Sequence, residues 1–194
     1  MCIRDSFYVE QAVAGPFSER LAARMSALKV GRGTEEGVGV GPLINATQRA
    51  KVAALVDDAV GKGAGVLCGG RVVDGPGWFY EPTVLSPVPA EADLLGEEIF
   101  GPVAPVLAFS SEGEAITAAN STEYGLVAYV FTRDLDRSLR VAERLKVGMV
   151  GLNTGVVSNP AAPFGGVKSS GFGREGGREG IDEYLDVKYV AIET

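Results

Sequence analysis

The chain has 194 residues, enough for one sizeable domain with its own core. It is 46% hydrophobic and 22% charged, typical of a globular protein, and its formal net charge is −7. An acidic chain repels phosphate backbones and anionic lipid surfaces, which argues against nucleic-acid and membrane partners. It contains no histidine, so Ser-His and Cys-His catalytic pairs and the usual zinc sites are excluded.

The first half of the chain alternates predicted strands and helices. Residues 7–9 predict a short strand, and a helix follows on apolar residues at helical spacing: Phe17, Leu21, Met25 and Leu28. Asn45, followed by Gln48, predicts an N-cap box for a second helix that ends at Gly63. Its apolar positions are Val52, Leu55, Val56 and Ala59. Residues 65–68 and 79–85 are expected to be extended.

The second half predicts strands at residues 103–109, 126–131 and 147–152. Helices are expected between them, one over residues 111–120 and one capped by Asp134. Apolar strands that alternate with helices predict the fold class: α/β, with a mostly parallel sheet flanked by helices.

The two cysteines, Cys2 and Cys68, are distant in sequence and indicate no disulfide framework, which favours a reducing, cytoplasmic setting. Cys68 follows a short apolar stretch and is expected to be a packed small hydrophobe. No apolar run approaches the roughly 18 residues that cross a bilayer. The first six residues do not resemble a signal peptide.

Residues 148–180 contain ten glycines with little helical or strand periodicity, which is typical of a functional loop. Within them, residues 171–176 fit the pattern G-x-G-x-x-G. A phosphate-binding loop of this type needs a strand directly before it and a helix directly after it. Neither is predicted here, so we interpret this stretch as a tight loop that packs on the sheet.

Two stretches are candidates for a ligand site. Residues 96–103, GEEIFGPV, place two carboxylates and an aromatic ring at the end of a predicted strand, where ligands of α/β folds collect; a solvated acidic turn is the alternative. Residues 163–171, PFGGVKSSG, surround an aromatic residue with Pro and Gly. That residue is either a core plug or the wall of a binding slot.

Together these stretches resemble the aldehyde dehydrogenase superfamily, and most of all its succinate-semialdehyde dehydrogenase branch. The resemblance runs from about Phe7 to the end of the chain. It rests on GPLIN (41–45), GEEIFGPV (96–103), GLVAYVFTRD (125–134), GMVGLNTG (148–155) and APFGGVKSSGFGREGGREGIDEYLDVKYV (162–190).

The resemblance implies oxidation of a small aldehyde to its acid with NAD or NADP as cofactor. A cysteine thiolate attacks the aldehyde, hydride leaves to the nicotinamide, and a glutamate-activated water hydrolyses the thioester. Glu98 matches the glutamate that holds the nicotinamide ribose, and Phe100 matches the aromatic residue beside it. Phe164 matches a wall of the aldehyde tunnel, and Ser158 matches a serine placed against the far carboxylate of succinate semialdehyde.

The resemblance also implies that parts of the enzyme lie upstream of this chain. The Rossmann-like half, the nucleophilic cysteine and the general-base glutamate are expected there, so no catalytic residue and no metal site is assigned within the 194 residues. Residues 1–6 are expected to be a leader foreign to the family, in which Cys2 lies about one residue beyond the position of the nucleophile. Residues 7–183 would form a truncated catalytic domain that is inactive alone.

The resemblance further implies that residues 184–194 are a C-terminal oligomerisation segment, whose strand at residues 186–190 pairs with a neighbouring subunit in a homo-oligomer. It also implies an ion pair between Arg174 and Asp186 near that interface. The alternative hypothesis is a genuine short protein without catalytic activity, which binds or regulates a partner and assembles through the same strand.

Overall fold

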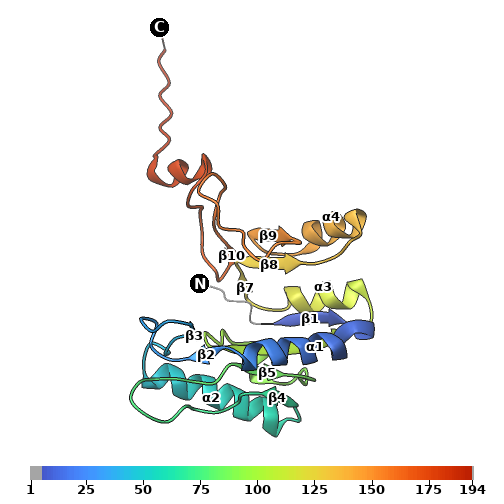
Figure 1. Cartoon of the computed structure of the whole chain (residues 1–194). Coiled ribbons are helices and arrows are strands. Elements are labelled where there is room, and N and C mark those ends of the chain that lie inside the picture. The colour runs from blue at the N-terminus through green and yellow to red at the C-terminus, as the bar shows by residue number, and fades with distance from the viewer. Residues whose placement is uncertain (1–5, 194) are drawn as a thin grey trace. The chain divides into compact units, whose positions relative to one another are not determined.

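The computed structural model describes residues 6–193. The chain forms two compact units, of which the first ends at Thr122 and the second begins at Glu123 (Figure 1). The first contains β1 (Phe7–Glu10), α1 (Gln11–Ser26), β2 (Lys29–Val30), β3 (Val38–Val40), α2 (Ala46–Gly61), β4 (Val66–Cys68), β5 (Thr83–Leu85), the 3₁₀ helix η1 (Asp93–Leu95), β6 (Val103–Phe109) and α3 (Glu112–Asn120). The second contains β7 (Tyr124–Gly125), β8 (Val127–Val130), α4 (Leu135–Arg144), β9 (Met149–Leu152), β10 (Val167–Lys168) and the 3₁₀ helix η2 (Glu179–Tyr184).

The first unit is built on a sheet with the strand order β1-β6-β5-β4. Strands β1 and β5 both run parallel to β6, with Phe7 opposite Val106 and Thr83 opposite Val103. Strand β4 is antiparallel to β5 and carries a register shift between Val66 and Cys68. The sheet is therefore mostly parallel, as the sequence predicted, with one antiparallel edge strand.

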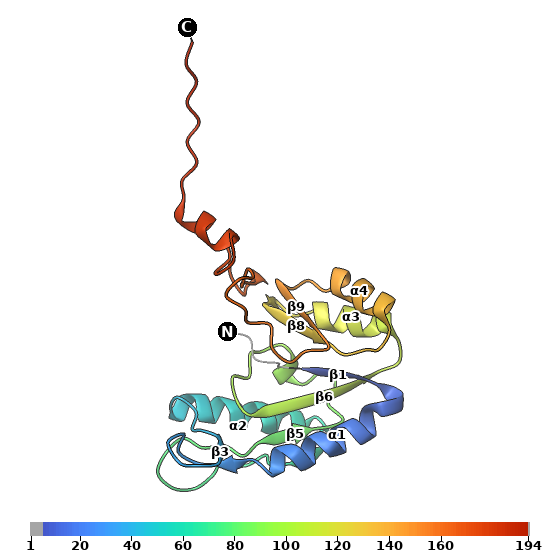
Figure 2. The same ribbon diagram turned by 45° about the horizontal axis from the view of Figure 1, so that its top comes forward.

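Helices cover both faces of this sheet. Successive side chains of a strand point to opposite faces: on β5, Val84 packs in the cluster of Ala22 from α1, whereas Leu85 packs in the cluster of Val52 from α2. Figure 2 shows α1 and α2 on opposite sides of β5 and β6. The result is the layered α/β arrangement that apolar parallel strands require.

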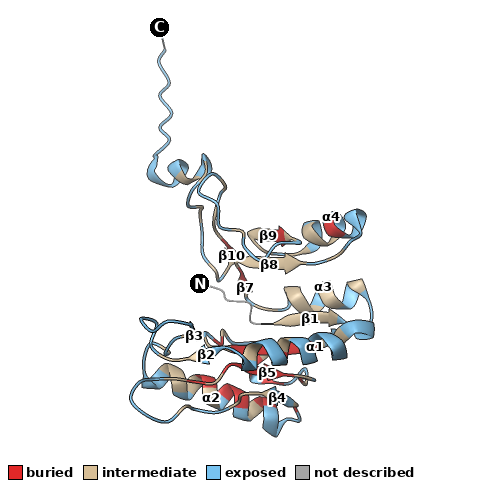
Figure 3. Cartoon of the chain, in the orientation of Figure 1, coloured by how far each residue is buried: buried red, intermediate tan, exposed pale blue. Residues whose placement is uncertain are grey.

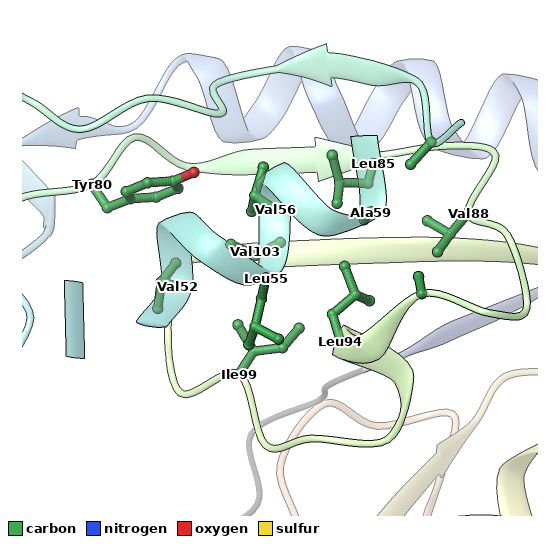
Figure 4. Packing of buried hydrophobic residues seen from close by; sticks show 12 residues of the cluster. Val52, Leu55, Val56, Ala59, Tyr80, Leu85, Val88, Leu94, Ile99 and Val103 are labelled. Carbon is green, nitrogen blue, oxygen red and sulfur yellow. The ribbon is translucent and has the colours of Figure 1, made fainter. Parts of the chain in front are cut away.

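The larger hydrophobic cluster surrounds α2 (Figure 4). It contains the four apolar positions predicted for this helix, Val52, Leu55, Val56 and Ala59, of which none is more than 6% exposed. Opposite them lie Tyr80, which precedes β5, and residues from β5, β6 and the segment between these strands, including Leu85, Leu94, Ile99 and Val103. Each fully buried aliphatic side chain of this kind contributes about 1.5–3 kcal/mol.

The predicted helix starts are confirmed by their caps. Asn45 Oδ1 accepts a hydrogen bond from Gln48 N at 2.8 Å, and Asp134 Oδ1 accepts one from Arg137 N at 3.0 Å. Ser111 Oγ does the same for Glu114 N at 3.3 Å. Gly63, with φ +106°, follows the end of α2 in a conformation that favours glycine.

The second unit pairs β8 with β9 in parallel and β7 with β10 in antiparallel. The sequence predicted β8, α4 and β9, but not the two-residue strands β7 and β10, nor β2 and β3 in the first unit. Beyond η2, residues 185–193 form no strand, and Val187 and Tyr189 are almost fully exposed (Figure 3). The strand expected in this tail is therefore not formed within the chain, and Tyr184 belongs to η2.

None of the helices in residues 6–193 is long and apolar enough to cross a membrane. Cys2, and with it most of the leader expected at residues 1–6, lies outside the described residues.

Candidate functional site

Glu98 and Phe100 lie in an irregular segment that is anchored to the core by the residue between them. Ile99 is 1% exposed and packs in the cluster around α2. Glu98 is half-buried, and Phe100 is 38% exposed. The segment thus buries its apolar residue, with a half-buried Glu98 on one side of it and an exposed aromatic ring on the other.

Two polar side chains of α2 hold the main chain of this segment. Gln48 Nε2 donates to the carbonyl oxygens of Ile99 and Phe100, at 3.0 and 3.3 Å. Lys51 Nζ donates to the carbonyl oxygen of Glu98 at 2.9 Å and pairs with the carboxylate of Glu97 at 3.2 Å. The sequence indicated Gln48 only as part of an N-cap box. The structure uses its backbone N–H there and sends its carboxamide to the candidate site.

The backbone at Phe100 is strained. Its φ of +49° lies in the left-handed region, which costs a non-glycine residue about 1–2 kcal/mol. The next residue, Gly101, lies so close to α2 that a Cβ there would come within 2.6 Å of Val52 Cγ2. Such a conformation persists only where its surroundings impose it, and it is common at ligand sites. Here α2 imposes it, through the two carbonyl hydrogen bonds from Gln48 and the contact at Gly101.

The second unit carries the two predicted substrate residues, Phe164 and Ser158. Phe164 is half-buried and belongs to neither hydrophobic cluster, which disfavours its interpretation as a core plug. It forms a bridge with Glu175, because each residue donates its N–H to the carbonyl of the other at 2.7 Å. Arg174 Nη1 donates to the carbonyl oxygens of Gly166 and Gly173, at 2.8 and 2.6 Å. The two arms of the glycine-rich loop are therefore cross-linked next to Phe164.

The predicted ion pair between Arg174 and Asp186 is wrong for this chain. No ion pair between them occurs in the described residues; the guanidinium is taken up by the two glycine carbonyls, and the backbone N–H of Arg174 donates to Glu183 Oε1 at 3.2 Å. Asp186 lies in the exposed tail beyond η2. The prediction failed because the sequence does not show that two backbone carbonyl groups lie close enough to accept hydrogen bonds from the guanidinium of Arg174.

Ser158 is exposed, in the loop that joins β9 to the glycine-rich arms. Asn153 fixes the start of this loop: its Oδ1 accepts from Thr132 N at 2.9 Å and its Nδ2 donates to Thr132 O at 2.8 Å. A cavity of about 550 Å³ lies beside this anchor and is lined by Phe131, Thr132, Arg133, Leu135, Ser138 and Asn153. Neither Ser158 nor Phe164 lines this cavity.

The residues from Gly171 to Gly176 do not form a phosphate-binding turn. The two-residue strand β10 ends at Lys168, and the helix that follows, η2, is a 3₁₀ helix that begins at Glu179. The glycines at 171, 173 and 176 have positive φ, as a tight loop requires. The interpretation as a loop is confirmed.

Cys68 is half-buried against the cluster of α1, and its Sγ lies 3.6 Å from the carbonyl oxygen of Pro82. Burial raises the pKa of this thiol, so it is protonated at neutral pH and a poor nucleophile. This agrees with its interpretation as a packed small hydrophobe. Within residues 6–193, no group of three His, Cys, Asp or Glu side chains is arranged to hold a metal ion.

Fold and site together define a layered α/β domain with a carboxylate and an aromatic ring displayed next to a parallel strand, the class of domain that binds small ligands. The chain belongs to the aldehyde dehydrogenase family, with which it matches over residues 1–190. The family expected from the sequence is thereby confirmed.

Three relatives agree with this assignment. The chain is 56% identical to a succinate-semialdehyde dehydrogenase of Paenarthrobacter nicotinovorans, over 97% of this chain and 42% of the relative. It is 51% identical to a glutarate-semialdehyde dehydrogenase of Pseudomonas putida and 49% identical to the NADP⁺-dependent succinate-semialdehyde dehydrogenase of Escherichia coli, in both cases over 97% of this chain and 39% of the relative.

A solved structure shows the same fold. The succinate-semialdehyde dehydrogenase of Burkholderia pseudomallei superimposes with a TM-score of 0.93 at 50% identity, over 96% of this chain and 39% of that one. The chain therefore spans about 40% of the length of the relatives it matches.

Proposed function

We propose that this chain is part of the catalytic domain of an NAD(P)-dependent dehydrogenase that oxidises succinate semialdehyde to succinate. The observation that carries the proposal is the Glu98–Phe100 segment, which α2 holds in a strained conformation with its aromatic ring exposed. Strain and three main-chain hydrogen bonds are not needed to build a solvated acidic turn. They are expected where a ligand must meet preorganised groups.

The residues of this segment fit the nicotinamide end of the cofactor. A carboxylate accepts hydrogen bonds from both hydroxyls of a ribose, and an exposed phenyl ring is a flat apolar surface against which a heterocycle packs. When bound, the cofactor supplies the hydride acceptor of the reaction. Glu98 then orients the ribose and Phe100 limits the movement of the ring beside it, while Gln48 and Lys51 keep both residues in place.

The substrate side is assigned to the second unit. Phe164, fixed by its bridge to Glu175, is proposed as an apolar wall for the short carbon chain of the aldehyde. Ser158 is proposed to donate a hydrogen bond to the far carboxylate of the substrate. Glutarate semialdehyde, which is one methylene longer, is the second candidate because a relative at 51% identity is named for it.

The nucleophilic cysteine and the general-base glutamate are proposed to lie outside the described residues, since Cys68 is a half-buried thiol whose pKa is raised by burial. The tail is proposed to pair with a second copy of the enzyme in a homo-oligomer. Its exposed apolar side chains support this, because an isolated segment with Leu185, Val187, Tyr189 and Ile192 at 62–100% exposure gains by burial. Neither a nucleic acid nor a membrane is expected as a partner of the acidic chain.

A chimera tests the proposal. The matching 42% of the P. nicotinovorans relative is replaced by this chain, and the oxidation of succinate semialdehyde and glutarate semialdehyde is measured with NAD and with NADP. We expect activity, with succinate semialdehyde as the better substrate. A chimera that folds and binds cofactor but oxidises neither aldehyde would refute the substrate class. A chain that forms oligomers on its own but gives no active chimera would favour the non-catalytic alternative.

Two substitutions in the chimera test the assigned residues. Glu98→Gln removes a charged acceptor worth about 1.5–3 kcal/mol, so the KM for cofactor is expected to rise about tenfold or more. Ser158→Ala is expected to raise the KM for succinate semialdehyde about tenfold and to leave butanal, which has the same carbon chain without the carboxylate, unchanged. An equal effect on both aldehydes would show that Ser158 does not read the carboxylate.

A further inference from the structure

Asp93, at the start of η1, is bound through all three of its polar groups. Its carboxylate Oδ1 lies 2.7 Å from Lys62 Nζ, and its backbone N–H donates to Asp58 Oδ2 at 2.9 Å. Lys62 also pairs with Asp58 Oδ1 at 2.7 Å, across one turn of α2. The three charged residues form one cluster that ties η1 to the C-terminal half of α2.

The third polar group of Asp93 connects this cluster to the candidate site. Its carbonyl oxygen accepts hydrogen bonds from the backbone N–H groups of Gly96 and Glu97, at 3.0 and 3.2 Å. Glu97 is in turn held by Lys51, and it directly precedes Glu98. An unbroken series of contacts therefore leads from Lys62 through Asp93 and Glu97 to the residues assigned to the cofactor.

The geometry places the two attachments at opposite ends of one helix. Gln48 and Lys51, in the N-terminal half of α2, hold the Glu98–Phe100 end of the segment, and Asp58 and Lys62 hold the η1 end. Between them, Leu94 and Ile99 are 0% and 1% exposed in the core. The whole segment is therefore strapped along α2, and release of either end would let the carboxylate of Glu98 move.

We infer that Asp93 is a positioning residue for the cofactor site: the cluster of Asp58, Lys62 and Asp93 fixes the orientation of Glu98 without touching the ligand. This inference rests on the proposed function for the identity of the ligand. The clamp itself is a property of the chain and can be tested without any ligand.

Hydrogen exchange of the backbone amides of the chain tests the clamp. Lys62→Met removes both ion pairs, Asp58→Ala removes one ion pair and the acceptor of the Asp93 amide, and both new residues favour a helix. Loss of two exposed ion pairs is expected to speed exchange at the amides of Gly96 and Glu97 about tenfold, while the amides in the middle of α2 keep their rates. Lys62→Arg keeps the charge and is expected to restore slow exchange.

Lys29→Met is the matched control, because it removes another exposed ion pair of the same unit, with Glu35 at 3.6 Å, that does not adjoin the segment. In the unchanged chain, 1 M salt is expected to reproduce part of the effect of Lys62→Met, since exposed charges are screened. Unchanged exchange at Gly96 and Glu97 in both cluster variants would overturn the inference. So would an equal acceleration throughout α2, because the cluster would then serve general stability.

The effect of the cluster on cofactor binding is measured in the chimera. Lys62→Met is expected to raise the KM for cofactor about threefold to tenfold at unchanged kcat, and Lys62→Arg to reverse it. If Glu98→Gln raises this KM and Lys62→Met does not, the positioning role is wrong and the proposed function stands. If neither changes it while exchange responds as expected, the clamp is real and the assignment of the cofactor to Glu98 fails.

Discussion

Replacing Tyr80 by phenylalanine is expected to stabilise the first unit. Tyr80 is 1% exposed in the cluster around α2 (Figure 4), and its hydroxyl has no hydrogen-bond partner in the described residues. A buried polar group without a partner costs about 1–3 kcal/mol, whereas an apolar group of the same shape is neutral or favourable. Tyr80→Phe should therefore raise the free energy of unfolding by about 1 kcal/mol at pH 8, or the melting temperature by about 3 °C.

The pKa of Tyr80 gives a second, independent prediction, for the free energy of unfolding at alkaline pH. Burial, with a smaller contribution from the carboxylates of Asp57 and Glu81, raises the pKa of Tyr80 from 10.0 to about 12. Between pH 10 and pH 12 the unfolded chain has lost the phenolic proton and the folded chain keeps it. The free energy of unfolding is therefore at its full value below pH 10 and falls as the pH rises through the folded pKa. At pH 11 the free energy of unfolding is lower by about 1.4 kcal/mol. The Tyr80→Phe variant lacks this effect because phenylalanine has no phenolic proton.

Urea unfolding of the chain and of the variant at pH 8 and pH 11 measures both effects. Every other ionisable group is the same in both proteins, so the difference between the two free energies isolates Tyr80. It is expected to grow from about 1 kcal/mol at pH 8 to about 2.4 kcal/mol at pH 11. A variant that is less stable than the unchanged chain at pH 8 would show that the hydroxyl has a hydrogen-bond partner, and a difference that does not depend on pH would refute the raised pKa.

Further substitutions test the site and its support. Gly101→Ala would drive a methyl group to within 2.6 Å of Val52 Cγ2 and is expected to cost about 1–3 kcal/mol in urea unfolding, whereas Gly113→Ala, in open space on α3, should gain about 0.5–1 kcal/mol; equal effects would contradict the contact. Phe100→Gly should relieve the positive φ, worth about 1 kcal/mol, but lose the packing of a ring that is 38% exposed, so stability is expected to change little while cofactor binding in the chimera weakens. Lys62 and the backbone N–H of Asp93 lower the pKa of Asp58 below 3.8, so the stability that it contributes is present above that value and lost as pH falls through the folded pKa. The stability difference between the chain and its Asp58→Asn variant should therefore shrink as the pH falls below 3.8.

The layered architecture follows from signals that are local in sequence. The strand at residues 103–109 is an uninterrupted apolar run, and the structure has it with the same bounds. The helix starts at Asn45 and Asp134 each depend on a hydrogen bond from the backbone N–H three residues later to the capping side chain. Because this signal is local, the sequence alone predicts it. The strands β2, β3, β7 and β10, of two or three residues each, have no such signal, because so short a strand is set by its tertiary neighbour rather than by its own residues.

The sequence indicated which residues belong to the candidate site, but not which residues hold them in place. Glu98 and Phe100 stand out as a carboxylate and a ring before a buried strand. That Gln48 reaches the carbonyls of Ile99 and Phe100, 51 and 52 residues away, could not be read from a sequence in which it also fits an N-cap. Arg174 shows the opposite case: the family resemblance implied Asp186 as its partner, whereas in the structure its guanidinium donates to two glycine carbonyls.

The antiparallel edge strand β4 affects how readily the sheet of the first unit can pair with a strand from another molecule. Val66 and Leu67 are each 43% exposed there, an edge that would otherwise invite a strand from another molecule. The register shift between Val66 and Cys68 interrupts the even spacing of N–H and C=O groups that an incoming strand must match. The register shift therefore disfavours edge-to-edge pairing through β4, although that strand carries no charged residue.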